Sequence, residues 1–450
     1  MELANLRVTL MGLGRFGGGV GAARWLASRG ARVLITDLSS EETLREPLTE
    51  LAPLMAEGRI TLRLGSHEIN DFVDTDLVVV NPAVPRPWQS PYLQRAFASN
   101  VPITTEIGLL VERLPNRRRV IGITGSVGKS TTSAMIARAL KATGEPVKLG
   151  GNIGGSLLES LDDITDQTWV VLELSSAMLY WLGVTQRWSP AISVCTNLSP
   201  NHIDWHSTPE HYASSKQEIL RYQDKDDLAI LGPGLESWSG VTLAKVINVG
   251  HAHFTGRLRI PGQHNRQNAG VALATCRAAS PLTDPQAFEH ALGTFGGLPH
   301  RLELVGEVAG KRFYNDSKCT TVSSLMQALD SLRDPARGTS HIHLIAGGYD
   351  KGVSLSPVAQ LAPSLAGLYC VGKTGPTIGA EAMLRAPERV HHCETVREAT
   401  LAAISAMGAG DVLLLSPACA SWDQYPNYEH RGAAFVDAVR SQFGASLDAV

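Results

Sequence analysis

Short apolar runs alternate with helix-patterned segments along most of the chain. Apolar runs bounded by glycine and proline are typical of buried strands, and helices between them indicate parallel sheets. The clearest strand candidates are 6–11, 33–36, 77–80, 101–104, 120–123, 170–174, 191–195, 312–314, 341–346 and 412–415. Helical patterns occur at 18–28, 131–140 and 269–279. The pattern therefore predicts an α/β protein with mostly parallel sheets.

Two breaks in this alternation divide the chain. The first is Leu114-Pro115-Asn116 with three arginines after it, and the second is Gly296-Gly297-Leu298-Pro299. A chain of 450 residues is also too long for a single hydrophobic core. We therefore predict three domains, 1–115, 116–298 and 299–450.

A glycine loop at 123–132 joins a predicted strand to a predicted helix. Exposed N–H groups and the positive end of a helix, about half an elementary charge, favour phosphate there. Lys129 would reach the terminal phosphates of a nucleotide, and the Ser130 hydroxyl would hold Mg²⁺. Ile123 stands where the full P-loop pattern has its first glycine, so this is a shortened form. The predicted phosphate-binding residues are Gly125, Ser126, Gly128, Lys129, Ser130 and Thr131.

A second glycine motif, Gly12-x-Gly14-x-x-Gly17, follows the first predicted strand. Asp37 lies twenty residues after Gly17, which is the spacing of a dinucleotide fingerprint. An NAD-linked oxidoreductase is therefore one alternative. Against it, 123–132 is the better phosphate loop, and the first segment is short for a complete dehydrogenase nucleotide domain. A third interpretation is that these glycines only permit close packing of a helix on a strand.

Polar residues cluster directly after several predicted strands, where open parallel sheets place their ligand sites. We expect Glu173 to act on the metal of a bound nucleotide, and the amides of 262–268 to contact adenine or ribose. Further clusters lie at 315–318, 347–352 and 416–423.

Three histidines, His202, His206 and His211, raise the possibility of zinc. No glutamate follows His202 as in an H-E-x-x-H helix, and Pro200 and Pro209 interrupt helical geometry. A solvated loop with His202 as its functional residue is the better hypothesis.

Composition narrows the possible partners. The chain has 40 basic and 43 acidic residues, so the balance of −3 gives no electrostatic case for nucleic acid. Six cysteines without a C-x-x-C pair indicate reduced thiols. The start lacks a signal-peptide pattern, and no apolar run approaches the roughly 18 residues of a membrane helix. We expect a cytoplasmic monomer that does not insert into a membrane.

Eight short motifs occur in a fixed order: Gly-Ser-Val-Gly-Lys-Ser-Thr, Gly-Gly-Asn-Ile-Gly, Glu-Leu-Ser-Ser, His-x-Asp, Gly-Gln-His-Asn, Leu-Pro-His-Arg, Asn-Asp-Ser-Lys and Ser-Pro-Ala-Cys-Ala-Ser. In that order they resemble the Mur ligases of peptidoglycan synthesis over essentially the whole chain. The last three look most like the glutamate-adding branch, whereas all Mur and folylpolyglutamate ligases share the phosphate loop. The resemblance implies a Rossmann-like N-terminal domain for a UDP-linked substrate, a central P-loop ATPase domain and a Rossmann-like C-terminal domain for the amino acid.

The resemblance also implies roles for individual residues. The catalytic set is Lys129, Glu173, His202 and Lys216. The Mg²⁺ ligands are Ser130, Glu173, His202 and Lys216, the last as a carbamate formed from CO₂. ATP would also contact Asn265, Arg301 and Asp316. UDP-N-acetylmuramoyl-L-alanine would contact Gly14, Arg15, Phe16, Thr36, Asp37 and Asn152. Glutamate would contact Lys318, Thr320, Lys351, Ser421 and Tyr428.

The implied reaction is amide synthesis through an acyl phosphate, in which ATP activates the alanyl carboxylate and the glutamate amine displaces phosphate. Some positions depart from the residues usual in the family, namely Ala177, Met178, Cys319, Trp422 and Tyr428. D-glutamate is the expected amino acid, and the same chemistry with L-glutamate or another amino acid stays open. A nucleotide-binding module without activity is a further alternative, and the complete catalytic set argues against it.

Overall fold

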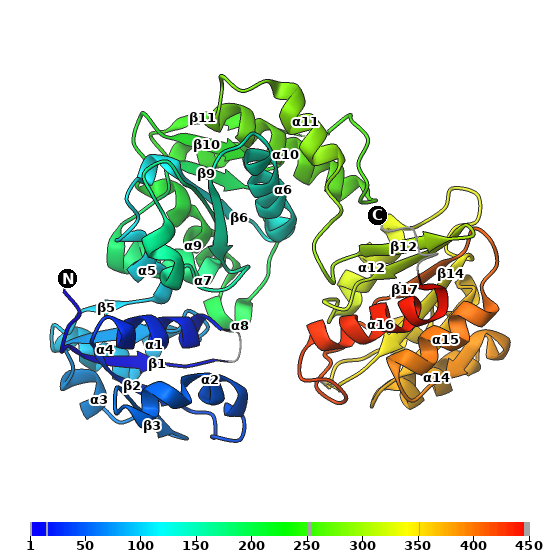
Figure 1. Cartoon of the computed structure of the whole chain (residues 1–450), viewed down its shortest axis with the longest axis horizontal. Coiled ribbons are helices and arrows are strands. Elements are labelled where there is room, and N and C mark those ends of the chain that lie inside the picture. Colours follow the sequence, from blue (N-terminus) through cyan, green and yellow to red (C-terminus); the bar gives the residue numbers. More distant parts are fainter. Residues whose placement is uncertain (1, 15–16, 251–253, 351, 445–450) are drawn as a thin grey trace. The chain divides into compact units, whose positions relative to one another are not determined.

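The computed structural model describes residues 2–14, 17–250, 254–350 and 352–444. Within these residues the chain forms three sheets flanked by helices (Figure 1). Nearly all of the paired strands are parallel, so the predicted α/β class with mostly parallel sheets is confirmed. The chain divides into two compact units, Met1–Thr255 with Gln267–Leu292, and Gly256–Arg266 with Gly293–Val450.

The first sheet has five parallel strands in the order β3-β2-β1-β4-β5. Its strands are β1 (Arg7–Met11), β2 (Arg32–Asp37), β3 (Ile60–Leu64), β4 (Leu77–Val80) and β5 (Ile103–Thr104). Its helices are α1 (Gly18–Ser28), α2 (Arg45–Ala56), α3 (Asn70–Val73), α4 (Pro91–Ala98) and α5 (Glu106–Val111), with the 3₁₀ turn η1 (Pro87–Gln89).

Alternation along these strands gives the sheet two buried faces. Val8 and Leu10 pack with α1, whereas Val78 and Val80 pack with α3 and α4 on the other face. The hydrophobic core on the α1 face continues into residues of the second sheet, among them Leu172. This shared core explains why the first two sheets belong to one compact unit.

The second sheet has six parallel strands in the order β11-β10-β9-β6-β8-β7. Its strands are β6 (Val120–Thr124), β7 (Val147–Gly151), β8 (Trp169–Glu173), β9 (Ile192–Cys195), β10 (Leu228–Leu231) and β11 (Lys245–Asn248). Its helices are α6 (Lys129–Ala142), α7 (Ser176–Trp181), α8 (Ile203–His206), α9 (Pro209–Arg221), α10 (Gln263–Ala279) and α11 (Pro285–Gly293). Shorter turns are η2 (Arg117–Arg119), η3 (Leu158–Asp163), the π-helical η4 (Leu182–Gln186) and η5 (Glu236–Val241).

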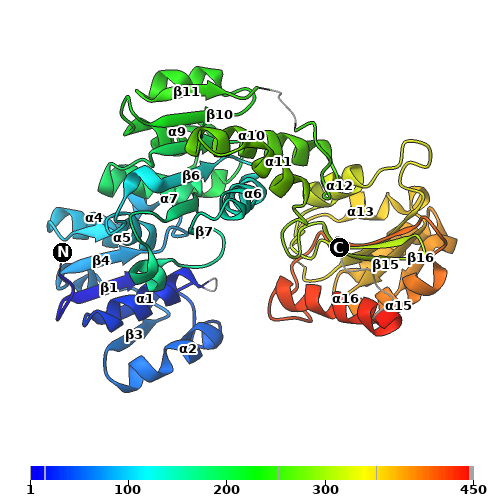
Figure 2. The same ribbon diagram turned by 45° about the horizontal axis from the view of Figure 1, so that its top comes forward.

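Helices cover both faces of this sheet (Figure 2). The Cys276 thiol on α10 contacts the Ile136 carbonyl on α6, and the Arg138 side chain donates to the Ala291 carbonyl of α11. On the other face, the buried Ser193 hydroxyl of β9 donates to the Ile219 carbonyl of α9. The carboxyl ends of β6, β8 and β9 are thereby held between two helical layers.

The third sheet lies in the second unit, in the order β12-β13-β17-β14-β15-β16. Its strands are β12 (Glu303–Val308), β13 (Lys311–Asn315), β14 (Ile342–Gly347), β15 (Gly367–Val371), β16 (Val390–His392) and β17 (Val412–Leu415). Its helices are α12 (Val322–Ser331), α13 (Ser356–Ala359), α14 (Gly375–Met383), α15 (Val396–Ala406) and α16 (Tyr428–Phe443), with the turns η6 (Ala362–Ser364) and η7 (Pro387–Arg389). Only the pairing of β12 with β13 is antiparallel among the described strand pairs.

Successive residues of this sheet also face opposite cores. Leu414 packs with α12 and α14, whereas Leu413 and Leu415 pack with α15 and α16. Both faces are therefore covered, as is usual for a mostly parallel sheet.

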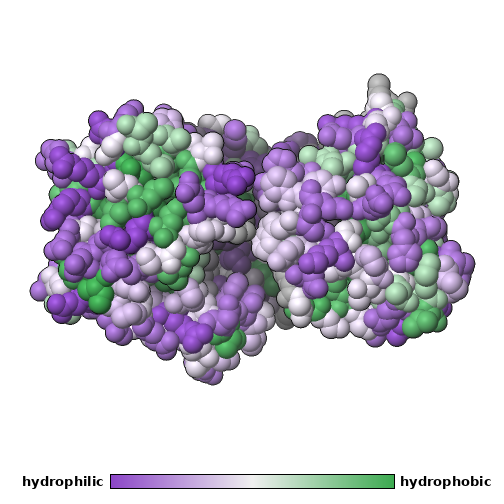
Figure 3. Space-filling view, turned by 90° about the horizontal axis from the view of Figure 1, so that it is seen from below, coloured by the Kyte–Doolittle hydropathy of each residue, from purple (hydrophilic) through white to green (hydrophobic). Residues whose placement is uncertain are grey.

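None of the described helices is long and apolar enough to cross a membrane. On the face shown in Figure 3, apolar residues gather in several patches that polar residues border.

Candidate functional site

The glycine loop between β6 and α6 is built around two glycines with positive φ. Gly128 has φ 84°, and a Cβ there would collide with the Asn268 side chain. Gly125 has φ 146°, and a Cβ there would collide with the Thr196 hydroxyl. Only glycine fits either position without strain. The backbone therefore turns tightly before Lys129, the first residue of α6.

Two lysine amines meet on the carbonyl groups of this loop. The Lys129 Nζ atom donates to the carbonyls of Gly125 and Ser126 at 3.0 and 3.1 Å. The Lys216 Nζ atom, from α9, donates to the same Gly125 carbonyl at 2.8 Å. Lys216 is 1% exposed, and burial together with the charge of Lys129 lowers the pKa of Lys216 to about 7. The sheet thus brings two lysine amines to one carbonyl.

Glu173, at the end of β8, is buried beside these lysines. Its Oε1 atom accepts a hydrogen bond from the Asn152 Nδ2 atom at 2.9 Å, while its Oε2 atom has no hydrogen-bond partner among the described residues. An unsatisfied buried carboxylate oxygen is costly, so this oxygen is well suited to act as a ligand of a cation. The donor set therefore fits Mg²⁺, which prefers oxygen ligands.

His202 precedes α8 with φ 51° and lies within electrostatic range of both lysines. Desolvation lowers its pKa, Asp204 opposes the shift, and the charges of the two lysines add to it. The sheet therefore brings Lys129, Glu173, His202, Lys216 and Asn152 together with the loop residues Ser130 and Thr131 in the first unit.

The other two histidines make structural contacts. The Nε2 atom of the buried His206 lies 2.9 Å from the Ser176 hydroxyl, and its Nδ1 atom lies 3.1 Å from the His211 Nδ1 atom. Burial lowers the pKa of His206 to about 4. No group of three or more His, Cys, Asp or Glu residues in the described part of the chain is arranged to hold a metal.

Two residues that the sequence did not single out hold the glycine loop. The Asn197 side chain accepts from the Val127 N–H at 3.0 Å and donates to the Val127 carbonyl at 2.9 Å. The Thr196 hydroxyl donates to the same carbonyl at 2.7 Å. Both residues directly follow β9, so their place after an apolar strand was the available signal. We call Thr196 and Asn197 the clamp on the glycine loop. A cavity of about 100 Å³ lies next to it, lined by Thr196, Asn197, Pro233, Gly250, Gln267, Asn268 and Val271.

At the first glycine motif, Asp37 is bonded to the loop itself. Its Oδ2 atom accepts from the backbone N–H groups of Leu13 and Gly14 at 2.8 and 3.4 Å. Thr36 is fully buried, and its hydroxyl lies 2.7 Å from the His67 Nδ1 atom. Arg15 and Phe16 lie outside the described residues.

The second unit gathers another group after β13 and β17. Asp316 is 7% exposed, and it accepts from the Leu302 N–H at 3.1 Å and from the Ser416 hydroxyl at 2.7 Å. Burial raises its pKa to about 6. The Lys318 Nζ atom lies 5.1 Å from the centre of the Tyr428 ring.

The remaining predicted residues of the second unit are placed as follows. Thr320 follows Lys318 in the same loop, and Ser421 is buried after β17. Arg301 lies near enough to Asp316 to lower its pKa in part, against the effect of burial. Asn265 lies elsewhere in the unit, in the first turn of α10, where its Nδ2 atom donates to the Pro261 carbonyl. Lys351 lies outside the described residues.

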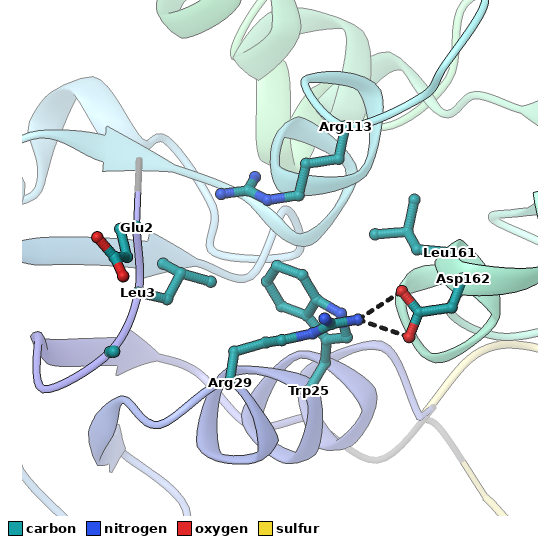
Figure 4. Close-up of a pocket in the computed structure, with 8 residues that line it drawn as sticks. Glu2, Leu3, Trp25, Arg29, Arg113, Leu161 and Asp162 are labelled. Carbon is teal, nitrogen blue, oxygen red and sulfur yellow. Dashed lines mark hydrogen bonds and ion pairs between the residues drawn. The ribbon is translucent and has the colours of Figure 1, made fainter.

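A larger cavity, about 390 Å³, lies away from the phosphate loop between α1 and η3 (Figure 4). The Trp25 ring lies between Arg29 and Arg113, whose guanidinium carbons are 5.7 and 5.1 Å from its centre. Arg29 also donates twice to the Asp162 carboxylate at 2.8 Å. The ion pair between Arg29 and Asp162 joins α1 of the first sheet to η3 of the second.

The fold and this geometry define a nucleotide-binding α/β protein. Comparisons with known proteins identify its family. The Mur ligase middle domain matches residues 123–234, and the glutamate ligase domain of Mur ligases matches residues 300–419. The UDP-N-acetylmuramoylalanine–D-glutamate ligase of Koribacter versatilis is 34% identical over 98% of this chain and 98% of that protein. The enzyme of that name from Symbiobacterium thermophilum is 35% identical over 93% and 94%. The chain belongs to the Mur ligase family.

Solved structures share the fold. MurC, a UDP-N-acetylmuramate–alanine ligase from Thermotoga maritima, aligns with a TM-score of 0.59 and 18% identity, over 97% of this chain and 100% of that one. The MurF ligase from Thermotoga maritima, in complex with ADP, aligns with a TM-score of 0.53 and 16% identity, over 98% and 96%. At this identity the likeness establishes the fold alone.

Proposed function

We propose that this chain is an ATP-dependent ligase that joins D-glutamate to UDP-N-acetylmuramoyl-L-alanine in peptidoglycan precursor synthesis. The observation that carries the proposal is the full-length match, at 34–35% identity, to enzymes named for this activity. The convergence of Lys129 and Lys216 on the glycine loop supports it, together with the charge of Glu173 near Lys216.

The proposed chemistry has two steps. An oxygen of the alanyl carboxylate forms a bond to the γ-phosphorus of ATP, and the bond from that phosphorus to the bridging oxygen breaks and releases ADP. The amine of glutamate then attacks the acyl carbon, and phosphate leaves with the electrons of the C–O bond while the nitrogen loses a proton. Activation is needed because a bare carboxylate is a poor electrophile.

Lys129 would exchange its two backbone carbonyls for phosphate oxygens when nucleotide binds. Its charge then lowers the repulsion between the carboxylate and the triphosphate, which is the main barrier to their approach. Ser130, Glu173, His202 and Lys216 as a carbamate would hold Mg²⁺, whose chemistry is to neutralise charge on the phosphate oxygens. The unsatisfied Oε2 atom of Glu173 is the observation that fits this role.

The carbamate on Lys216 is part of the proposal. The free amine, when protonated, places a second positive charge beside Lys129, on a carbonyl that both share. Attack of the amine nitrogen on CO₂, with loss of a proton, would replace that charge by an anion able to bind a cation. ¹³CO₂ should give a carbamate carbon signal in the wild type and none in Lys216→Ala, and short carboxylic acids should partly restore activity to Lys216→Ala. Full activity of that variant without added acid would refute the carbamate.

The remaining expectations are proposals of the same kind. The segment 1–115 would bind the UDP-linked substrate through Gly14, Arg15, Phe16, Thr36 and Asp37, with Asn152 from the central segment. The segment 116–298 would bind ATP, together with Asn265, Arg301 and Asp316. The segment 299–450 would bind glutamate through Lys318, Thr320, Lys351, Ser421 and Tyr428. The protein would act as a monomer, which light scattering can test.

Family membership decides against the NAD-linked alternative for the first glycine motif.

The test is a substrate panel read as phosphate release and product mass. With ATP, Mg²⁺ and UDP-N-acetylmuramoyl-L-alanine, D-glutamate should support turnover, whereas L-glutamate and other amino acids should not. Equal rates with L-glutamate would overturn the predicted handedness. ATP binding without amino-acid-dependent turnover would overturn the ligase assignment.

A further inference from the structure

Arg431, on the first turn of α16, is a buried cation whose charge the site described above does not use. It is 2% exposed. Its Nε atom donates to the Ser317 hydroxyl at 3.0 Å, and its Nη2 atom donates to the carbonyls of Ser317 and Cys419 at 2.7 and 3.0 Å. Its Nη1 atom donates to the Ala420 carbonyl at 3.0 Å. All of these acceptors are neutral.

No carboxylate of the described residues forms an ion pair with this guanidinium within 4.0 Å, and the charge of Asp423 acts on it only from a longer distance. Burial lowers the pKa of Arg431 to about 10, so the group stays protonated at neutral pH. A buried charge without an opposite charge in contact is expensive and is rarely retained for stability alone. The positive charge is therefore available to an anion that binds nearby.

The acceptors of Arg431 lie in loops that follow neighbouring strands. Ser317 follows β13, and Cys419 and Ala420 follow β17. The loop after β14, the other neighbour of β17, is also in contact, because a Cβ on Gly348 would lie 3.1 Å from the Nη1 atom. A single side chain thus bonds to the loops after β13 and β17 and lies beside the loop after β14, at the strand ends where open sheets bind ligands.

The residues that follow these acceptors are those proposed to hold glutamate. Lys318 comes directly after Ser317, and Ser421 directly after Ala420. Ser317 is also bonded to the start of α16, since its hydroxyl donates to the Tyr428 carbonyl at 2.8 Å. A shift of the guanidinium would therefore move the backbone that carries Lys318, Ser421 and Tyr428.

We propose that Arg431 is a positioning and specificity-determining residue for the amino-acid substrate. It fixes the loops after β13 and β17, and its buried charge favours an amino acid with a second carboxylate over its neutral amide. This inference rests on the proposed function, because it takes glutamate as the substrate that these loops hold.

The test compares D-glutamate with D-glutamine in the wild type, Arg431→Met, Arg431→Lys and Arg431→Leu. KM and kcat are measured for both amino acids at saturating ATP and UDP-N-acetylmuramoyl-L-alanine. Arg431→Met should raise the KM for D-glutamate, and its preference for D-glutamate over D-glutamine should fall about tenfold, as expected for one charge acting across several ångströms of protein. Arg431→Lys should keep most of the preference because it keeps the charge, with a lower kcat because it cannot bond to both loops. The KM for ATP should stay within about twofold of the wild type.

Arg440→Met is the matched control, because Arg440 is an exposed arginine of the same helix, and it should behave as the wild type. A general loosening of the fold would weaken both amino acids equally, so an unchanged preference in Arg431→Met would overturn the proposal. If Arg431→Met and Arg431→Leu fail to fold, Arg431→Lys decides. This variant keeps the charge, so a tenfold loss of its preference for D-glutamate over D-glutamine would contradict the proposal. A wild type without glutamate-dependent turnover would instead refute the proposed function.

Discussion

The polar groups at the strand ends of the two units are satisfied in different ways. In the first unit, the amines of Lys129 and Lys216 rest on carbonyls of the glycine loop, and one oxygen of Glu173 has no partner among the described residues. In the second unit, both oxygens of Asp316 accept hydrogen bonds, and Arg431 donates four.

This difference separates groups that exchange partners from groups that hold a shape. If the Lys129 amine turns to a phosphate, the Gly125 carbonyl still accepts from the Lys216 amine. A buried carboxylate or guanidinium in a complete network cannot change partners without leaving other groups unsatisfied. We therefore expect substitutions in the first unit to affect catalysis most, and those in the network of the second unit to affect local stability or amino-acid selectivity.

The largest expected effect is on turnover in Lys129→Ala. Loss of a preorganised charge on the phosphates should lower kcat by about 10²–10³-fold. Steady-state phosphate release measures this. Lys141→Ala is the control, because Lys141 is an exposed lysine in the last turn of the same helix. Near-normal turnover in Lys129→Ala would remove the glycine loop from the chemistry.

The second prediction concerns the pH dependence of local stability at Asp316. Its native pKa of about 6 lies above the ordinary 3.8, so between these values the native state binds more protons than the unfolded chain. Stability at β13 and β17 should therefore fall as pH rises through 6, by on the order of 2–3 kcal/mol in total. Hydrogen exchange of these strands should show this fall in the wild type and a flatter profile in Asp316→Asn.

Asp334→Asn is the opposite-sign control in the same unit. Hydrogen bonds from the backbone of Arg337 and Ala336 lower the pKa of Asp334, so its stabilising contribution is lost as the pH falls below the ordinary range. Identical pH profiles for Asp316→Asn and the wild type would show that the hydrogen bonds of Asp316 rearrange without cost. That result would contradict the difference drawn between the two units.

The third prediction concerns the clamp on the glycine loop. Asn197→Ala removes two hydrogen bonds to Val127, and Thr196→Val removes one. At about 1 kcal/mol per bond, the KM for ATP should rise about thirtyfold in Asn197→Ala and about fivefold in Thr196→Val. The reverse order, or no effect in either variant, would mean that ATP itself shapes the loop.

The smallest effect is expected at the ion pair between Arg29 of α1 and Asp162 of η3. Arg29 and Asp162 are 42% and 78% exposed as side chains, and such surface pairs contribute roughly 0–1 kcal/mol. Arg29→Ala should therefore lower the free energy of unfolding by less than about 1 kcal/mol and leave kcat unchanged. A large loss of turnover in Arg29→Ala would contradict this expectation and would indicate a catalytic role for the cavity beside Trp25.

The sequence was most informative where the signal is local. Helix α1 and strands β4 and β17 have the bounds expected from the apolar pattern, and α6 begins two residues before the expected helix. In contrast, β7 was missed because it ends in Gly150-Gly151, and β12 because it is an antiparallel edge strand that carries Glu303 and Glu307 around an irregularity in register.

The sequence was least informative where the partner is distant along the chain. The clamp joins Asn197 to Val127 across the sheet, which no local pattern encodes. Arg431 was missed for a related reason, because an arginine in a helix is usually exposed and only the packed loops bury this one. Asp37 was recognised by its spacing, but its bonds to Leu13 and Gly14 depend on how the loop folds.

The central claim is that the glycine loop after β6 binds the triphosphate through Lys129. The most direct measurement is a crystal structure with a non-hydrolysable ATP analogue, Mg²⁺ and UDP-N-acetylmuramoyl-L-alanine. The account predicts that the Lys129 amine leaves the carbonyls of Gly125 and Ser126 and contacts the γ-phosphate, with the metal bound to Glu173. A triphosphate bound elsewhere, with Lys129 still on those carbonyls, would contradict it.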